Sequence, residues 1–237
     1  MQIQSKMIDT DQAKLLVAPA EIKYSSFTFP DEVIDNMRHL ITRSSRNTPL
    51  PSRLAVVAAL REEGVTYVSR ALAAALTNDL GERVCLVDLN WWYPADTSFI
   101  SPDNGGLAAV LAGQTTLGDV LVQTGWANLH LLPAGSVPKQ ERPALARSQA
   151  LREVLTQLNH SYDHLIMDIP AILATNDAVP LASLGSACCL VIRQGVTWME
   201  DVKLALDEID HLSIMGVVMN KFKLNTPSFL VKLFSAW

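Results

Sequence analysis

The amino-acid sequence predicts an α/β fold, a doubly wound, mostly parallel sheet with helices on both faces. The first observation is that short, nearly continuous apolar runs alternate with helical segments along most of the chain. Such runs are typical of strands covered by helices on both sides, and the alternation indicates right-handed crossovers between parallel strands. The second is composition: 49% of the 237 residues are apolar and 18% are charged, which favours a folded domain with a large core.

Composition also narrows the class of protein. The net charge of −5 argues against nucleic acid as the main partner. Every apolar stretch is shorter than the roughly 18 residues of a transmembrane helix, and the first residues lack the apolar region of a signal peptide. Cys85, Cys188 and Cys189 lie in apolar runs, where adjacent residues of a strand point to opposite faces. We therefore expect buried free thiols and a cytoplasmic protein.

The chain divides into four parts: an N-terminal arm (1–29), a helix and linker (30–52), a main domain (53–222) and an apolar C-terminal tail (223–237). The first helix follows Pro30, has acidic residues in its first turn and carries one apolar stripe: Val33, Ile34, Met37, Leu40 and Ile41. In the main domain we expect strands over 54–59, 83–88, 129–132, 164–168, 187–193 and 216–219. Helices are expected over 66–80, 107–111, 117–123, 149–159 and 199–212.

A strand, a glycine-containing loop and a helix follow one another between residues 54 and 80, which is the arrangement of a P-loop. In such a loop, backbone N–H groups and the helix N-terminus hold phosphates, a lysine reaches the β- and γ-oxygens, and Ser or Thr binds Mg²⁺. Gly64 and Thr66 stand at the required positions, but Val65 occupies the place of the lysine. Two carboxylates, Glu62 and Glu63, stand where an anion would enter, and Arg61 is the candidate replacement cation.

Asp88 and Asp168 end two further apolar runs. In an open α/β sheet, ligands bind beyond the carboxyl ends of the strands, where a carboxylate beside a P-loop can hold Mg²⁺ or activate a nucleophile. The alternative is that each aspartate only caps a helix or forms a turn. Thr66, Asp88 and Asp168 are the candidate metal ligands, and the two aspartates are the candidate catalytic residues. The five histidines show no metal-binding spacing.

Several motifs in order resemble the kinase domain of the bacterial tyrosine kinases of capsule and exopolysaccharide synthesis, the BY-kinases. The segment Ala59-Leu-Arg-Glu-Glu-Gly-Val-Thr66 resembles their A/S-x-x-x-G-E-G-K-T loop, Asp88-Leu-Asn-Trp-Trp-Tyr-Pro94 their D-x-D-x-R-x-P motif, and Ile166-Met-Asp-Ile-Pro-Ala171 their I-I-D-x-P-P motif. Further matches in the same order are Gly106 to Gly113, Leu131 to Gly135, Asn176 to Ala178, Val191 to Thr197 and Gly216 to Asn220. The resemblance runs from about Glu32 to Phe222.

This resemblance implies a P-loop NTPase fold and ATP with Mg²⁺ as cofactors, with Gly64, Val65, Thr66, Tyr67 and Asn220 at the nucleotide. The departures concentrate at that site: Val65 replaces the lysine, Glu62 a glycine, Asn90 the second aspartate and Trp92 the arginine. The family also ends in a tyrosine cluster that is autophosphorylated, whereas the tyrosines here are Tyr24, Tyr67, Tyr93 and Tyr162. We therefore expect weak or absent nucleotide binding and catalysis.

Three hypotheses on function follow from the resemblance. The favoured one is a degenerate BY-kinase-like protein that regulates exopolysaccharide or capsule synthesis and export by binding. Its expected partner is a membrane protein that sets polysaccharide chain length, or a kinase paralogue. The alternatives are an active ATP-dependent tyrosine kinase or ATPase relying on Thr66, Asp88 and Asp168, and a relative of the partitioning ATPases.

Three other features leave alternatives open. Trp91 and Trp92 either pack on a neighbouring element or anchor a partner. The tail, with Phe229, Leu230, Leu233, Phe234 and Trp237, either docks on the domain, contacts a membrane protein or lies at the inner membrane surface. The helix after Pro30 resembles the E-x-x-R-x-x-R segment that joins BY-kinases into octameric rings, but Asp35 stands at the middle arginine. Its stripe could equally pack on its own domain, and we expect a monomer or a hetero-complex.

Overall fold

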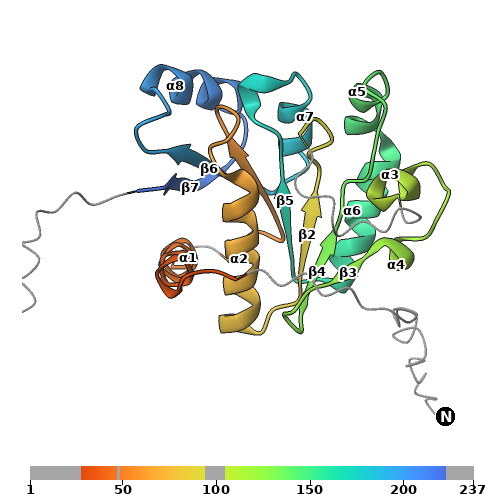
Figure 1. Ribbon diagram of the computed structural model, residues 1–237, viewed down its shortest axis with the longest axis horizontal. Helices are drawn as coiled ribbons and strands as arrows, with labels where there is room; N and C mark the ends of the chain where they lie inside the picture. The colour runs from red at the N-terminus through yellow and green to blue at the C-terminus, as the bar shows by residue number, and fades with distance from the viewer. Residues whose placement is uncertain (1–27, 47–48, 94–104, 223–237) are drawn as a thin grey trace, which may run out of the picture.

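A seven-stranded, mostly parallel sheet forms the centre of the protein, as the sequence predicts (Figure 1). The computed structural model describes residues 28–46, 49–93 and 105–222. The strand order is β3-β4-β2-β5-β1-β6-β7, and only the β3–β4 pair is antiparallel. The strands are β1 (Arg53–Ala58), β2 (Val84–Asp88), β3 (Val122–Gln123), β4 (Leu129–Leu132), β5 (His164–Asp168), β6 (Ala187–Arg193) and β7 (Ile214–Asn220).

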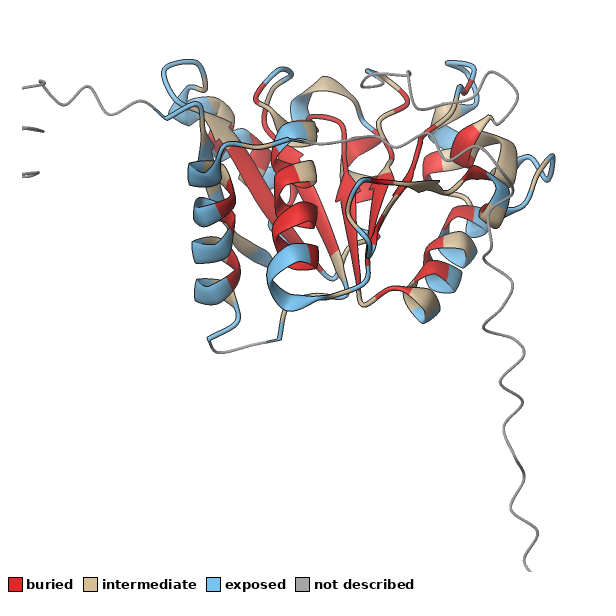
Figure 2. Cartoon of the chain, turned by 60° about the horizontal axis from the view of Figure 1, so that its bottom comes forward, coloured by how far each residue is buried: buried red, intermediate tan, exposed pale blue. Residues whose placement is uncertain are grey.

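Helices cover both faces of this sheet. They are α1 (Asp31–Ser44), α2 (Val65–Leu80), α3 (Gly106–Leu111), α4 (Leu117–Val120), α5 (Arg142–Ala146), α6 (Gln149–Ser161), α7 (Ala178–Ala182) and α8 (Met199–Glu208), with a 3₁₀ turn at Ile172–Ala174. Buried side chains of α1 and α2 form one core with one face of the strands. Side chains of α3, α4, α6, α7 and α8 form the other. Figure 2 shows the strands as the buried layer, with helices exposed only on their outer sides.

The central strands β1, β2 and β5 are apolar except at their ends, because both of their faces are covered. Residues Leu54 to Ala58 of β1 are all buried. Cys188 and Cys189 belong to the two different cores, and they and Cys85 are free thiols, which confirms the expected alternation. No helix in the described part of the chain is long and apolar enough to cross a membrane.

Some predicted boundaries were wrong. The predicted helix 117–123 ends at Val120, because Leu121 is extended (φ −67°, ψ 127°) and the next two residues pair with β4 as β3. The predicted helix 199–212 ends at Glu208, since the chain must turn before β7 begins at Ile214. Strand β7 is accordingly longer than the predicted 216–219. Sheet pairing and chain reversal overrode the local helical pattern.

Helix α1 packs on α2 of its own chain. Ile34, Met37 and Ile41 of its apolar stripe are buried there. Arg38 adds polar contacts, because its Nε and Nη2 donate to the Asp79 carboxylate of α2 at 2.5 and 2.8 Å and its Nη1 donates to Asp35 at 2.6 Å. Of the two roles left open for this stripe, the described residues support packing on the domain.

The tryptophan pair also packs on a neighbouring element. Trp91 is buried, and its indole N–H donates to the Ala134 carbonyl at 2.8 Å. Trp92 is half-buried, with its ring centroid 6.1 Å from that of Trp91. Of the two alternatives, packing on a neighbouring element or anchoring a partner, the first therefore holds for Trp91.

Candidate functional site

The predicted site residues meet at the carboxyl ends of β1, β2 and β5. Asp88 and Asp168 are direct partners in the register of β2 and β5, and Val56 of β1 is the partner of Asp168 on the other side. The loop of residues 59–64 follows β1 and leads directly into α2. Parallel order therefore brings the loop and both aspartates to one edge, as expected for an open α/β sheet.

The loop has a left-handed backbone at two positions. Gly64, the residue before α2, has φ +100°, and a Cβ at this position would lie 2.0 Å from Nδ2 of Asn220. The Asn220 amide lies this close because it donates to the Glu63 carbonyl at 2.8 Å. Glu62 also has a positive φ, +65°, which is unfavourable for a residue with a side chain. This is the position at which the resembling family has glycine, the residue that adopts a positive φ without strain.

The Glu63 side chain is buried against the loop and stabilises it, whereas the sequence-based expectation placed this carboxylate where an anion would enter. Its side chain is 1% exposed, and its carboxylate accepts hydrogen bonds from the Leu60 N–H (2.9 Å) and the Thr197 hydroxyl. Arg193 donates to the Glu62 carbonyl at 3.3 Å. Arg193 is the last residue of β6 and Thr197 follows that strand, and their place in the Val191 to Thr197 match was the only sequence signal for them. Of the two loop carboxylates, only Glu62 is left exposed.

A cavity of about 210 Å³ lies at the loop where a phosphate would bind. Its lining includes the loop from Leu60 to Thr66, together with Asn90, Tyr93, Ile169 and Ala171. Val65 contributes an apolar side chain where the motif has its lysine. Arg61 also lines the cavity, with its guanidinium carbon 3.5 Å from the centroid of the Tyr93 ring. A cation–π contact of this kind holds the charge at the rim of the cavity.

Asp88 and Asp168 form a carboxylate pair at the ends of β2 and β5, next to Thr66 of the loop. Asp168 is 3% exposed, and burial, followed by the neighbouring charge of Asp88, raises its pKa to about 7. Burial also raises the pKa of Asp88. The Asn90 backbone N–H, which donates to the Asp88 carboxylate at 2.9 Å, and the charge of Arg70 oppose this rise. A hydrogen bond from Thr66 and the charge of Arg70 act against the rise at Asp168. Arg70, one helical turn beyond Thr66, was missed in the sequence because it belongs to no motif.

The oxygen donors of this pair fit Mg²⁺ held together with a phosphate. Asp168 Oδ1 is buried and, among the described residues, has no hydrogen-bond partner, so it could accept a hydrogen bond from a metal-bound water. Thr66, Asp88 and Asp168 are the residues that would hold the ion, and it would supply charge neutralisation at a bound phosphate. Within residues 28–46, 49–93 and 105–222, no three His, Cys, Asp or Glu side chains gather into a metal-binding cluster. The donors are therefore too few for a site made of protein ligands alone.

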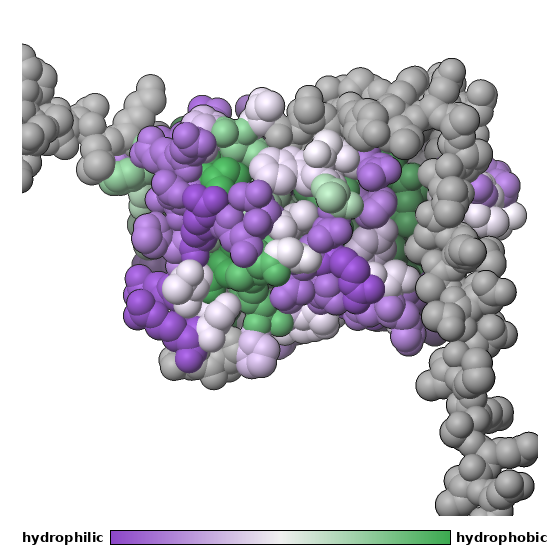
Figure 3. Space-filling view, turned by 90° about the horizontal axis from the view of Figure 1, so that it is seen from below, coloured by the Kyte–Doolittle hydropathy of each residue, from purple (hydrophilic) through white to green (hydrophobic). Residues whose placement is uncertain are grey.

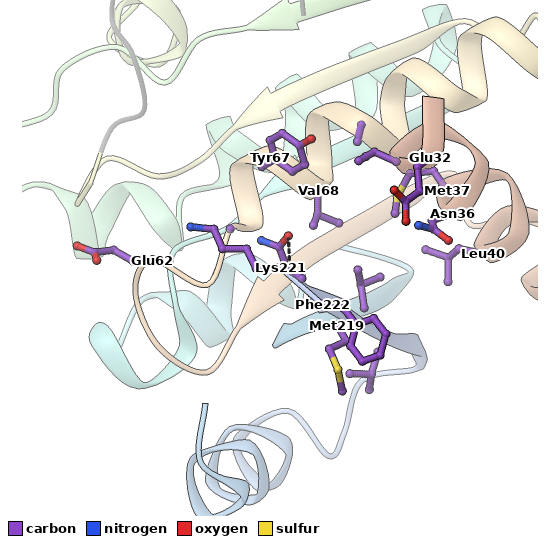
Figure 4. A pocket seen from close by; sticks show the side chains of 16 residues that line it. Glu32, Asn36, Met37, Leu40, Glu62, Tyr67, Val68, Met219, Lys221 and Phe222 are labelled. Carbon is purple, nitrogen blue, oxygen red and sulfur yellow. Dashed lines mark hydrogen bonds between the residues drawn. The ribbon is translucent and has the colours of Figure 1, made fainter. Parts of the chain in front are cut away.

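The five residues predicted for nucleotide contact divide between two hollows. Val65 and Thr66 line the phosphate cavity, whereas Tyr67 and Asn220 line a larger groove of about 930 Å³ between α1, α2 and β7, and Gly64 borders both. Figure 4 shows this groove, with Glu32, Asn36, Met37 and Leu40 of α1 on one side and Met219 and Phe222 on the other. Phe29 makes an edge-on contact with Tyr67, with ring centroids 5.3 Å apart.

The sheet order, the loop between β1 and α2 and the two strand-end aspartates define a protein of the P-loop NTPase fold. The chain belongs to the family described as cellulose biosynthesis protein BcsQ, whose model matches residues 54–223. Its sequence is also similar to tyrosine-protein kinases of bacteria. It is 28% identical to Etk of Escherichia coli K12 over 171 residues, which is 70% of this chain but 23% of Etk. It is 27% identical to YwqD of Bacillus subtilis over 176 residues, 73% of each chain.

Solved structures agree with this fold. The VpsO kinase domain superposes with a TM-score of 0.71 at 24% identity, covering 81% of this chain and 97% of that one. The septum site-determining protein MinD of Pyrococcus horikoshii, solved with Mg-ADP, superposes with a TM-score of 0.58 at 25% identity, covering 76% and 75%. A further sequence relative is the succinoglycan biosynthesis transport protein ExoP of Rhizobium meliloti, at 26% identity over 81% of this chain and 26% of ExoP. These matches confirm the sequence-based assignment of fold and of resemblance to BY-kinases.

Proposed function

We propose that this chain is a regulatory or binding component of bacterial exopolysaccharide synthesis and export, with weak or no catalysis of its own. Relatives in this process support the choice of pathway, since one is a succinoglycan biosynthesis transport protein and the matching family is named for cellulose biosynthesis. The proposed partner is a membrane protein that controls chain length or export, or a kinase paralogue. The proposed location is the cytoplasm, at the inner face of the membrane when that partner is bound.

The observation that carries the proposal is Val65 in the wall of the phosphate cavity. A charge-assisted contact contributes about 1.5–3 kcal/mol, so the absence of the lysine would weaken nucleotide binding by roughly 10- to 150-fold. The exposed carboxylate of Glu62 adds repulsion at the same cavity. Asn90 and Trp92 remove a carboxylate and a cation from the motif that follows β2.

Calorimetric titration of the full chain with ATP at physiological Mg²⁺ tests the proposal. We expect a dissociation constant well above 10 μM, the value that corresponds to about −7 kcal/mol. A kinase domain that carries the lysine of the loop motif serves as the positive control. Binding tighter than 10 μM would contradict the pseudo-kinase assignment.

A second candidate function is an active kinase or ATPase, and Arg61 is the observation that favours it. Its guanidinium lines the phosphate cavity, while Thr66, Asp88 and Asp168 keep the oxygen donors for Mg²⁺. In this case ATP would bind tightly, and Arg61→Ala would remove most of the binding. Arg152→Ala, which changes an exposed arginine of α6, is the matched control.

A further inference from the structure

Strand β7 forms an edge of the sheet without the features that protect natural edge strands. It pairs with β6 on one side, and within the described residues no strand pairs with its other side. Its seven residues, Ile-Met-Gly-Val-Val-Met-Asn, include neither a proline nor a charged side chain. The opposite edge strand, β3, has only two residues. A long, uncharged edge is a template for pairing with another strand, so this edge needs a cover.

The surface beside this edge is apolar as well. Val217, Met219 and Phe222 are 50%, 49% and 53% exposed. They border the 930 Å³ groove whose other walls include Met37 and Leu40 of α1. Figure 4 shows Met219 and Phe222 across the groove from the α1 side chains. Seen from below, the molecule has apolar side chains gathered in patches between hydrophilic ones (Figure 3). The occupant of this edge must therefore offer both backbone hydrogen bonds and apolar side chains.

We propose that residues 229–234 of the same chain, Phe-Leu-Val-Lys-Leu-Phe, pair antiparallel with β7 as an additional strand and close the groove with their side chains. This segment lies outside the described residues. Among the three roles that the sequence left open for the tail, the bare edge favours docking on the domain. The inference is independent of whether the loop binds nucleotide.

Chain length and connection support this occupant. The described chain leaves the domain at Phe222, which itself lines the groove, so the tail starts beside the open edge. Residues 223–228, Lys-Leu-Asn-Thr-Pro-Ser, contain the turn formers Asn225 and Pro227. The whole connection from Asn220 to Phe229 comprises residues 221–228, which is long enough for the chain to reverse, and a reversed chain that pairs with β7 is antiparallel to it. At about 3.4 Å per residue, the six residues span about 20 Å, close to the length of β7.

The residue types of the segment also suit the position. Phe, Val and Leu form an apolar strand that can fill the groove, and Phe and Val have high strand propensity. Lys232 is the only charged residue of the segment, and it would lie on the new outer edge of the sheet. Lysine at an edge prevents pairing with further chains, so the segment supplies the protection that β7 lacks.

Hydrogen exchange of the full-length chain, resolved to single amides, tests the pairing. In a strand, alternate N–H groups point to the two sides, so about half of the β7 amides point away from β6. We expect these outward amides to exchange at least about tenfold more slowly than in the Val231→Pro variant, because proline removes an N–H from the pairing strand. Ala236→Pro, just beyond the segment, is the matched control and should leave β7 protected. Unchanged exchange in β1 shows that each variant folds.

A second variant covers the case in which Val231→Pro disturbs the core. Phe229→Asp combined with Leu233→Asp keeps the backbone N–H groups but removes apolar contacts, and it should also expose β7. Equal exchange of β7 in the parent and in both variants would overturn the proposal. If the protection of the β7 amides rises with protein concentration, the edge pairs with a second copy. If it requires phosphatidylglycerol vesicles, the segment binds a lipid surface. Either result overturns pairing within one chain.

Discussion

At the scale of single residues, the loop between β1 and α2 differs from the P-loop motif at positions 62 and 65. Glu62 occupies a left-handed position (φ +65°) that suits glycine, and Val65 occupies the position of the lysine. Glu63 stabilises the loop from inside by accepting hydrogen bonds from Leu60 and Thr197. Positions 62 and 65 are therefore the two at which the residues of the motif are to be introduced.

We predict that Val65→Lys combined with Glu62→Gly increases the affinity for ATP. The lysine supplies a phosphate contact that contributes about 1.5–3 kcal/mol, and glycine adopts a positive φ without strain. Calorimetric titration should show roughly 10- to 150-fold tighter binding than the parent chain. Val65→Leu with Glu62→Gly is the control without the charge. A lysine variant that binds no better than the parent would mean that this loop is not a decayed phosphate site.

A second residue-scale prediction concerns the ion pair between Asp163 and Arg83, which joins the start of β2 to the start of β5. Arg83 donates from its Nη2 at 2.6 Å, from its backbone N–H at 2.9 Å and from its Nε at 3.1 Å. The Arg83 side chain, followed by its backbone N–H, lowers the pKa of Asp163 below the ordinary 3.8. A lowered carboxyl pKa contributes stability above the ordinary value, and this contribution is lost as the pH falls below it.

Asp163→Asn should therefore lower the free energy of unfolding at pH 7 by about 1 kcal/mol or less, because the pair is partly exposed to solvent. The difference between variant and parent should shrink as the pH falls below about 4. Urea titrations at pH 7, 5 and 3 measure this, with Asp207→Asn in the exposed face of α8 as control. A difference that stays constant from pH 7 to 3 would show that the charge of Asp163 does not contribute.

At the scale of elements, α1 is held to α2 by an apolar stripe and by Arg38. Because Arg38 bridges to Asp79 of α2, we predict that Arg38→Ala and Asp79→Asn both speed hydrogen exchange in α1 while leaving β1 unchanged. Arg43→Ala, an exposed arginine in the last turn of α1, is the control. Equal exchange in all four proteins would mean that the apolar stripe alone docks the helix.

Element boundaries show where local sequence patterns stop being sufficient. Residues 117–123 have a helical pattern, yet Val122 and Gln123 pair with β4 because a neighbouring strand offers them hydrogen bonds. Residues 199–212 have one as well, yet α8 ends at Glu208 so that β7 can align with β6. Both differences arise from partners distant in the sequence, which a periodicity within one segment does not contain.

At the scale of the whole molecule, the docking of α1 bears on assembly. Ile34, Met37 and Ile41 are buried within their own domain, and Arg38 is engaged with Asp79 and Asp35. An unpaired or like charge at an interface lowers affinity, and Asp35 replaces the middle arginine of the ring-forming segment. We predict a monomer, or a hetero-complex with a partner subunit. Light scattering at micromolar concentration checks this, and a single species of eight times 25.9 kDa would contradict it.

The sequence by itself determined the fold class, the strand-loop-helix unit, the two strand-end aspartates and the departures of Glu62, Val65, Asn90 and Trp92 from the motifs. These features are local, since apolar runs, helical periodicity and motif spacing are contained in short segments. Only the tertiary structure decided how the site is held together. The Thr197 hydroxyl donates to the Glu63 carboxylate over a separation of 134 residues, and the Asn220 amide donates to the Glu63 carbonyl over a separation of 157 residues. The charge of Arg70 acts on the carboxylate pair only after α2 packs on the sheet. Such contacts depend on strand order, and strand order depends on the burial of the whole sheet between its helices.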